Sequence, residues 1–188
     1  MKDEESDIFK RNVQEIVGEL YKERVEKIKE KEVLFYRLDE PEVFLNWAVL
    51  NNFLLHGSTR KIVENLKPYK ANDKIKESGN RLAIYITRVP MVAMFCALTG
   101  GVDGLARRHS SHTKIVQDEV SYDEMYFGVS DINKVASGGF IYILGKDQVD
   151  EEANGEFLAY REVSPLAILE INRKDFPFDI NIFDDNVN

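Results

Sequence analysis

A short apolar run that ends on small and polar residues is the first feature that suggests chemistry: residues 53–58 read FLLHGS. A histidine at the end of a strand donates or accepts a hydrogen bond through either ring nitrogen. The glycine after it leaves backbone N–H and C=O groups open to a closely packed ligand, and the serine adds a hydroxyl. His56, Gly57 and Ser58 are therefore candidate ligand-binding residues, and a structural strand-end histidine is the alternative.

Two aromatic residues follow in the next two expected elements. Tyr85 lies in an apolar run, residues 84–86, that predicts a strand, and Phe95 lies in a helix expected over residues 90–98. If these rings face each other across a narrow slot, a flat heteroaromatic ring between them gains stacking energy with little constraint on shape. Core packing of both side chains is the alternative.

The stretch NGEFLAYREVSP, residues 154–165, places a carboxylate at the start of an apolar strand. An acid there costs little when it is exposed and much when it is buried without partners. Glu156 is the candidate catalytic acid. Glu162 and Glu170 lie on the same run, periodicity does not choose between them, and Glu162 is the second choice.

A polar segment, residues 101–119, carries four basic side chains: Arg107, Arg108, His109 and His112. The two histidines have a spacing that a metal could use, but no third ligand is evident, so we predict no metal site. As a lid, the segment would bring its two arginines to the pyrophosphate of a dinucleotide. Arg60 is a third candidate for phosphate contact, and a solvated surface loop is the alternative for all of them.

Three helices are expected. Apolar residues recur at helical spacing over residues 6–31, with charges of both signs on the other face. Asp39, Glu40 and Pro41 begin a second helix that runs to Ala48, and Pro90 begins the third, which Gly100 and Gly101 end.

The remaining apolar runs are short, aromatic or β-branched, and separated by polar turns, which is typical of strands. They read FLLH, RLAIYIT, MYFGV, GFIYILG, EFLAYREV and LAILEI. We therefore predict an α+β protein: an N-terminal helical segment (1–51), a split antiparallel sheet core (52–178) and a polar tail that frays (179–188).

Composition restricts the class of protein. The 188 residues are 44% hydrophobic and 31% charged, as in a globular domain with one substantial core. The single cysteine, Cys96, forms no internal disulfide, and the acidic N-terminus lacks the apolar core of a signal peptide, so we expect a cytoplasmic protein. The longest apolar stretch, residues 82–98, is shorter than the ~20 residues of a membrane span. The net charge of -8 disfavours extended nucleic-acid binding.

The three stretches together resemble the ADP-ribosyltransferase fold of the diphtheria toxin and poly(ADP-ribose) polymerase type, whose signature is His, Tyr and Glu on three separate strands. The matching residues, in chain order, are Leu54, Leu55, His56, Gly57, Ser58, Tyr85, Ala93, Phe95, Ala97, Glu156, Phe157, Val163 and Pro165. The resemblance covers about residues 53–176, and the joint order of short motifs carries it.

The resemblance implies that NAD is the co-substrate. His56 would hydrogen-bond the adenosine-side ribose, the Gly57 backbone would pair with the nicotinamide carboxamide, and Tyr85 and Phe95 would stack on the nicotinamide ring. Glu156 would accept a hydrogen bond from the nicotinamide ribose hydroxyl and stabilise positive charge in an oxocarbenium-like transition state. The implied activity is mono-ADP-ribosyl transfer to an unknown acceptor, preferably a protein, with possible NAD glycohydrolase activity.

Two departures narrow this expectation. Phe95 stands where such families often have Tyr, and Asn154 stands where the arginine-modifying branch has a second Glu or Gln. An arginine-directed enzyme is therefore disfavoured. The alternatives are an RNA 2'-phosphotransferase, which should carry a basic cluster, a non-catalytic NAD- or ADP-ribose-binding relative, and a protein-interaction domain.

Overall fold

The computed structural model describes residues 11, 24–28, 33–70, 81–100, 108–117, 120–153 and 155–183. Its helices are α2 (Pro41–Leu50) and α3 (Pro90–Thr99), with short 3-10 turns at Ile132–Lys134, Lys146–Gln148 and Arg173–Asp175. Its strands are β1 (Arg24–Ile28), β2 (Val33–Arg37), β3 (Leu54–Ser58), β4 (Tyr69–Lys70), β5 (Leu82–Ile86), β6 (Arg108–Gln117), β7 (Val120–Val129), β8 (Gly138–Leu144), β9 (Glu151–Ala153), β10 (Glu156–Ala159), β11 (Ala167–Asn172) and β12 (Asn181–Ile182).

The strands form three sheets, with the orders β1-β2-β11-β8-β3, β4-β5-β10-β9 and β12-β7-β6. All neighbouring strands are antiparallel except the pairs β2–β11 and β7–β12. The fold class is therefore α+β with mostly antiparallel sheets, as the sequence predicts. The strand β3, which carries His56, lies at the edge of the five-stranded sheet.

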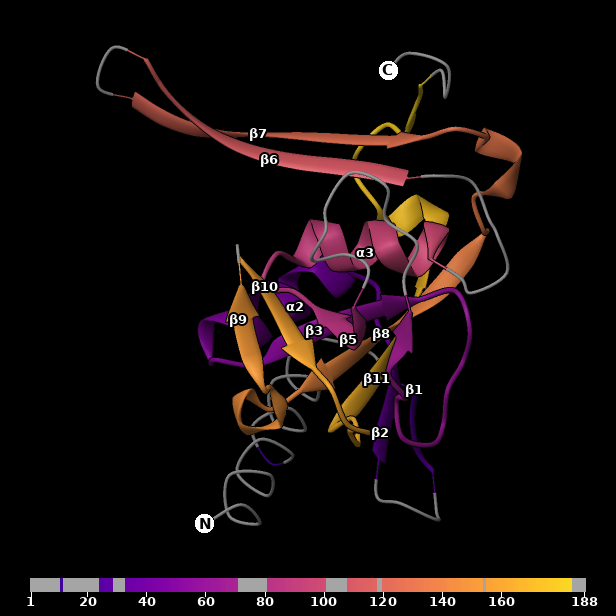
Figure 1. The fold of residues 1–188 in the computed structure, drawn as a ribbon. Coiled ribbons are helices and arrows are strands. Elements are labelled where there is room, and N and C mark those ends of the chain that lie inside the picture. The colour runs from indigo at the N-terminus through magenta and orange to yellow at the C-terminus, as the bar shows by residue number, and fades with distance from the viewer. Residues whose placement is uncertain are drawn as a thin grey trace.

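The five-stranded sheet is covered on both faces, because successive side chains of a strand point to opposite sides. On one face, Leu55 of β3 packs in a cluster with residues of both helices. On the other face, Leu54 packs in a second cluster with residues of β5 and β10 from the four-stranded sheet. The β6–β7 hairpin crosses over α3 on the side away from the five-stranded sheet, where Phe127 meets Phe95 (ring centroids 5.1 Å apart) (Figure 1).

Two glycines allow α3 to lie unusually close to this sheet. A Cβ atom at Gly57 would lie 2.7 Å from the backbone N of Ala97 and closer still to the carbonyl oxygen of Ala93. A Cβ atom at Gly139 in β8 would overlap the carbonyl group of Ala97. Helix and sheet thus meet backbone to backbone, which fixes the position of β3 relative to α3.

The helices expected at Pro41 and Pro90 are confirmed, each with proline in its first turn. The helix expected over residues 6–31 is wrong for residues 24–28, which form β1; its other residues, except Arg11, lie outside the described part of the chain. Strand β2, with four buried residues, was also missed. The segment 1–51 therefore contributes two strands to the five-stranded sheet: β2 pairs with β11, and β1 pairs with β2, which outweighs the local helical pattern of residues 24–28.

Two further expectations were partly wrong. The expected loop at residues 101–119 contains β6, which pairs with β7 along its whole length, while residues 101–107 and 118–119 lie outside the described chain. Hairpin pairing needs no apolar run, so a polar sequence conceals it. In the tail expected at residues 179–188, Asn181–Ile182 pairs with β7 as β12, and residues 184–188 are outside the described chain.

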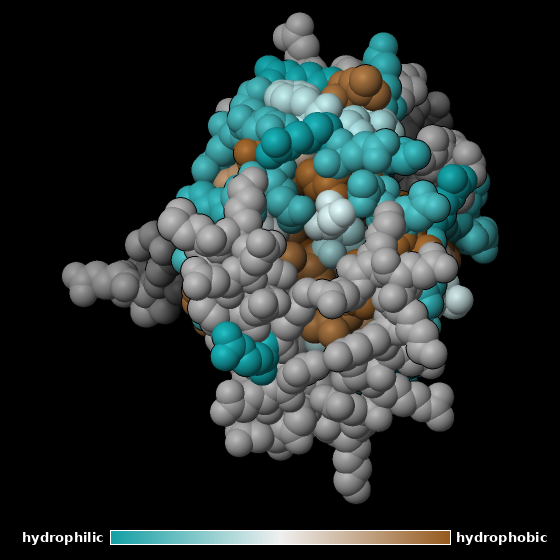
Figure 2. Space-filling view, turned by 90° about the horizontal axis from the view of Figure 1, so that it is seen from below, coloured by the Kyte–Doolittle hydropathy of each residue, from teal (hydrophilic) through white to brown (hydrophobic). Residues whose placement is uncertain are grey.

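Hydrophilic residues dominate the described surface on the face in Figure 2, and hydrophobic residues show between them near the centre. The most exposed large apolar side chains, Leu50, Leu82 and Ile182, lie on three different elements. Among the described residues, no helix combines the length and apolar character that a membrane crossing requires.

Candidate functional site

The three strands that carry the predicted site residues are neighbours in space. Strand β5 pairs with β10, with Tyr85 opposite Leu158. Just beyond β5, Thr87 exchanges two backbone hydrogen bonds, of 2.9 and 2.8 Å, with Leu55 of β3. The four-stranded sheet therefore joins the edge of the five-stranded sheet at this bridge and separates from it afterwards. We call the place where the two sheets part, around Leu55 and Thr87, the sheet junction.

His56 closes the sheet junction with its side chain. Its Nδ1 lies 2.7 Å from the carbonyl oxygen of Tyr85, and its ring lies 5.9 Å from that of Tyr142. Because a carbonyl oxygen only accepts, Nδ1 carries the proton, and Nε2 of the neutral ring is an acceptor. Among the described residues none hydrogen-bonds Nε2, so it can accept a hydrogen bond from a ligand hydroxyl.

The neutral form of His56 is the stable one at pH 7. The residue is 7% exposed, and burial of its ring lowers the pKa to about 4. The hydrogen bond to Tyr85 acts in the opposite direction, and the positive charge of Arg108 lowers the pKa further. This histidine is therefore an acceptor of fixed orientation and not a cation.

Gly57 packs against α3 with its Cα and presents its backbone N–H and C=O at the open edge of β3. Its backbone groups point away from β8: Leu55 directs its N–H and C=O to Thr87, and in an antiparallel pair residues two apart point the same way. A donor and an acceptor thus lie side by side on the open edge of β3, the arrangement that a primary carboxamide can pair with.

Ser58 is used within the turn after β3. Its Oγ accepts a hydrogen bond from the backbone N of Arg60 (3.1 Å). The next residue, Thr59, donates from both its backbone N (3.0 Å) and its Oγ1 (2.5 Å) to the carbonyl oxygen of Gly100 at the end of α3. The end of β3 is therefore tied to the end of α3.

The two predicted aromatic residues lie in different surroundings. The ring of Tyr85 lies 5.9 Å from that of Tyr69 in β4, and its hydroxyl donates to the carbonyl oxygen of Arg81 (2.9 Å). Phe95 is 1% exposed and packs against Phe127 and Phe176. The expected slot between Tyr85 and Phe95 is therefore not formed.

The reason lies in the helix geometry. Residues 93 and 97 of α3 face the glycines of β3 and β8, and at about 100° per residue position 95 points to the opposite side. Tyr69, and not Phe95, is the aromatic residue that lies next to the Tyr85 ring.

Of the three candidate acids, only Glu156 lies near the sheet junction. It begins β10, directly before Phe157, and Phe157 pairs with Ile86, the residue before Thr87. Glu162 lies beyond the other end of β10, exposed, with Lys67 Nζ 3.7 Å from its carboxylate. Glu170 lies in β11, with its carboxylate 4.0 Å from Arg37 Nη1. The structure thus separates Glu156 from Glu162 and Glu170, which the spacing of residues in the sequence does not do.

Three further residues lie near the open edge of β3: Arg108, which the sequence analysis names as a candidate for pyrophosphate contact, and Tyr69 and Cys96, which it does not assign to the site. Arg108, the first residue of β6, donates to the Tyr69 hydroxyl and packs against Gly100. Burial is the main cause that raises the pKa of Tyr69. Cys96 lies on the α3 face toward β3, with its Cβ 3.0 Å from the Cβ position of Gly57. The basic residues of segment 101–119 were the sequence signal for Arg108, and nothing in the sequence pointed to Tyr69.

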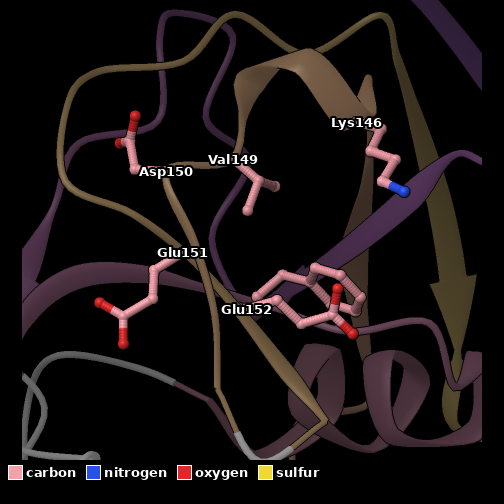
Figure 3. A pocket seen from close by; sticks show the side chains of 6 residues that line it. Lys146, Val149, Asp150, Glu151 and Glu152 are labelled. Atoms are coloured by element: carbon pink, nitrogen blue, oxygen red, sulfur yellow. The ribbon is translucent and has the colours of Figure 1, made fainter.

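A shallow pocket on the β9 side is separate from this site. It is lined by Lys146, Val149, Asp150, Glu151, Glu152 and Phe157. The carboxylates of Asp150 and Glu151 point in different directions (Figure 3). Phe157 faces the opposite side of β10 from Glu156, because neighbouring residues of a strand alternate. Within the described ranges, no three metal-ligating side chains lie together.

Comparison with family models, with curated proteins and with solved structures found no match.

Proposed function

We propose that the chain is an NAD-consuming ADP-ribosyltransferase, with water as a competing acceptor. The observation that carries the proposal is the meeting of three sequence motifs at the sheet junction. His56 and Gly57 contribute an acceptor and an open backbone edge, Tyr85 an aromatic face, and Glu156 a carboxylate. The finer assignment, that this α+β fold is of the ADP-ribosyltransferase type, rests on the same juxtaposition.

Binding would use groups of fixed orientation. The N–H and C=O of Gly57 would pair with the nicotinamide carboxamide, and Nε2 of His56 would accept a hydrogen bond from the adenosine-side ribose. Tyr85 would offer its ring to the nicotinamide. Phe95 would act indirectly, because its packing against Phe127 holds α3 in place.

The chemical step would break the bond between the nicotinamide nitrogen and C1 of its ribose, with the electron pair leaving on nicotinamide. The ribose would then carry oxocarbenium-like positive charge. Glu156 would stabilise that charge by accepting a hydrogen bond from the ribose hydroxyl. An acceptor nucleophile, or water, would attack C1 and lose its proton, which completes transfer or hydrolysis.

A protein acceptor fits the proposal better than RNA. The net charge of -8 disfavours the extended phosphate contacts that an RNA 2'-phosphotransferase would need.

The test is nicotinamide release from NAD by the wild type, Glu156→Gln and Glu162→Gln, with NAD binding measured on each. Loss of the charge at Glu156 should lower the rate about 100- to 1000-fold while NAD still binds. The matched control, Glu162→Gln, should keep the wild-type rate, because that acid lies at the far end of β10.

Binding of NAD without nicotinamide release, with and without a supplied protein acceptor, would favour the non-catalytic alternative. Equal rates in all three proteins would remove Glu156 from the reaction. If the wild type neither binds nor cleaves NAD, the proposal is wrong.

A further inference from the structure

The positively charged side chain of Arg108 lies at the open edge of β3. Along β3, Gly57 separates it from the bridge between Leu55 and Thr87. The guanidinium of Arg108 hydrogen-bonds the Tyr69 hydroxyl, packs on Gly100, and is near enough to His56 to lower its pKa. Gly100 is in turn bound to Thr59, two residues after Gly57. Arg108 therefore lies beside the same edge as His56 and Gly57, although it is far from both in the chain.

The backbone of Arg108 is anchored, while its side chain reaches solvent. Arg108 pairs with Val129 at the base of the β6–β7 hairpin, and Val129 is buried and accepts a hydrogen bond from the backbone N of Phe183. Figure 1 shows this end of β6 near the C-terminal end of α3. The residue itself is exposed, so an approaching ligand can reach it.

We propose that Arg108 binds the pyrophosphate of a dinucleotide that lies along the open edge of β3, and that Tyr69 holds the guanidinium in position. This inference rests on the proposed function and names the residue that recognises the anionic part of its substrate. An arginine binds phosphate oxygens through two parallel N–H bonds, which fixes orientation as well as charge.

Arg108 differs from Arg88 and Arg60 in its surroundings. The chain as a whole is acidic, so a dianionic ligand needs a local cation at its site. The guanidinium of Arg88 lies 5.0 Å over the ring of Phe157, which faces away from the Glu156 side of β10. Arg60 lies in the loop after β3, where its carbonyl oxygen binds the Tyr142 hydroxyl (2.7 Å).

The experiment is isothermal titration calorimetry of the full chain with three probes: inorganic pyrophosphate, ADP-ribose and nicotinamide. Arg108→Ala should weaken binding of the two phosphate-bearing probes about ten- to a hundredfold and leave the affinity for nicotinamide unchanged. Arg108→Lys, which keeps the charge without the planar fork, should lose less. Tyr69→Phe should weaken binding of these two probes a few-fold, since it removes only the hydroxyl that accepts from the guanidinium and positions it.

The matched control is Arg161→Ala. That arginine is also exposed and pairs with Asp150 (3.5 Å) beyond the other end of β10, so all three affinities should stay at the wild-type values. Circular dichroism of each variant verifies folding, and Arg108→Lys provides the test if Arg108→Ala does not fold.

Unchanged affinity of Arg108→Ala for ADP-ribose, an equal loss for nicotinamide, or no binding of either phosphate-bearing probe by the wild type would overturn the inference. Its failure is distinguishable from that of the proposed function. Arg108-dependent binding of pyrophosphate without NAD cleavage supports the anion site and contradicts the enzyme. NAD cleavage by a protein whose affinity for the phosphate-bearing probes does not depend on Arg108 supports the enzyme and contradicts the anion site.

Discussion

The polar residues at the two ends of the β5–β10 pair differ in burial and in charge. At the sheet junction, His56 is buried, neutral and bound through one ring nitrogen to the backbone of Tyr85. At the other end, Arg81 donates to both oxygens of Glu151 (2.6 and 2.8 Å) and to the Tyr160 hydroxyl (2.9 Å). Tyr160 in turn donates to Glu151 (2.5 Å).

The difference shows how polar groups can be arranged for binding or for their own pairing. The exposed cluster of Arg81, Glu151 and Tyr160 uses its donors and acceptors internally, and the bonds to Tyr160 and Arg81 lower the pKa of Glu151. The sheet junction instead keeps an imidazole acceptor and, at Gly57, a backbone edge that points away from β8. We therefore place the proposed ligand site at the second arrangement, because it leaves hydrogen-bonding capacity at fixed positions.

Gly57→Ala should break the sheet junction most severely. The new methyl group would meet the backbone of Ala93 and Ala97, which cannot move without displacing α3. We expect a loss of about 3 kcal/mol in the free energy of unfolding, measured by urea denaturation.

Gly145→Ala is the matched control for this substitution. Its Cβ would meet only the carboxylate end of Asp147, 2.6 Å away, which can swing aside. Equal stability losses in the two variants would contradict the close packing of α3 on β3.

The pH dependence of stability tests the buried neutral histidine. The unfolded chain binds a proton on His56 near pH 6.5 and the folded chain only near pH 4, so the unfolded state binds more protons between these values. The free energy of unfolding should therefore fall as the pH drops through this window, by about 2 kcal/mol at pH 5 relative to pH 8.

The measurement is the difference in the free energy of unfolding between wild type and His56→Gln from pH 5 to pH 8. The contributions of other titrating groups cancel in this difference. The variant should lack this part of the slope. Parallel curves for the two proteins would mean that His56 titrates as an exposed imidazole and that its Nε2 is not the acceptor we describe.

Arg81→Gln should have the smallest effect. The side chains of this cluster are substantially exposed, and exposed ion pairs contribute little to stability. We expect no measurable change in urea denaturation, in low or high salt, and no change in nicotinamide release. A clear loss of release would instead show that the far end of β5 positions Tyr85, whose hydroxyl binds the carbonyl oxygen of Arg81.

Much of the fold could be predicted where a local signal exists. Proline in the first turn marked both described helices, and short apolar runs, several of them aromatic or β-branched, marked β3, β5, β8, β10 and β11. Residues 24–28 were predicted wrongly, since their apolar spacing suits a helix as well as a strand and only pairing with β2, which itself pairs with β11, decides between them. The polar strand β6 was missed because its partner β7, and not its own composition, makes it a strand.

The sequence by itself determined which chemical groups are present and in what order: an imidazole and a glycine, then a tyrosine, then a carboxylate, on three separate strands. Only the tertiary structure decided that Tyr85 faces Tyr69 and not Phe95, and that Arg108 reaches the edge of β3. It also decided that Glu156 and not Glu162 lies at the end of β10 where Phe157 pairs with Ile86, next to the residue that bridges to Leu55. The physical reason is that side-chain direction and long-range register depend on contacts between distant residues. The hydrogen bond that sets the tautomer of His56 spans 29 positions of the chain.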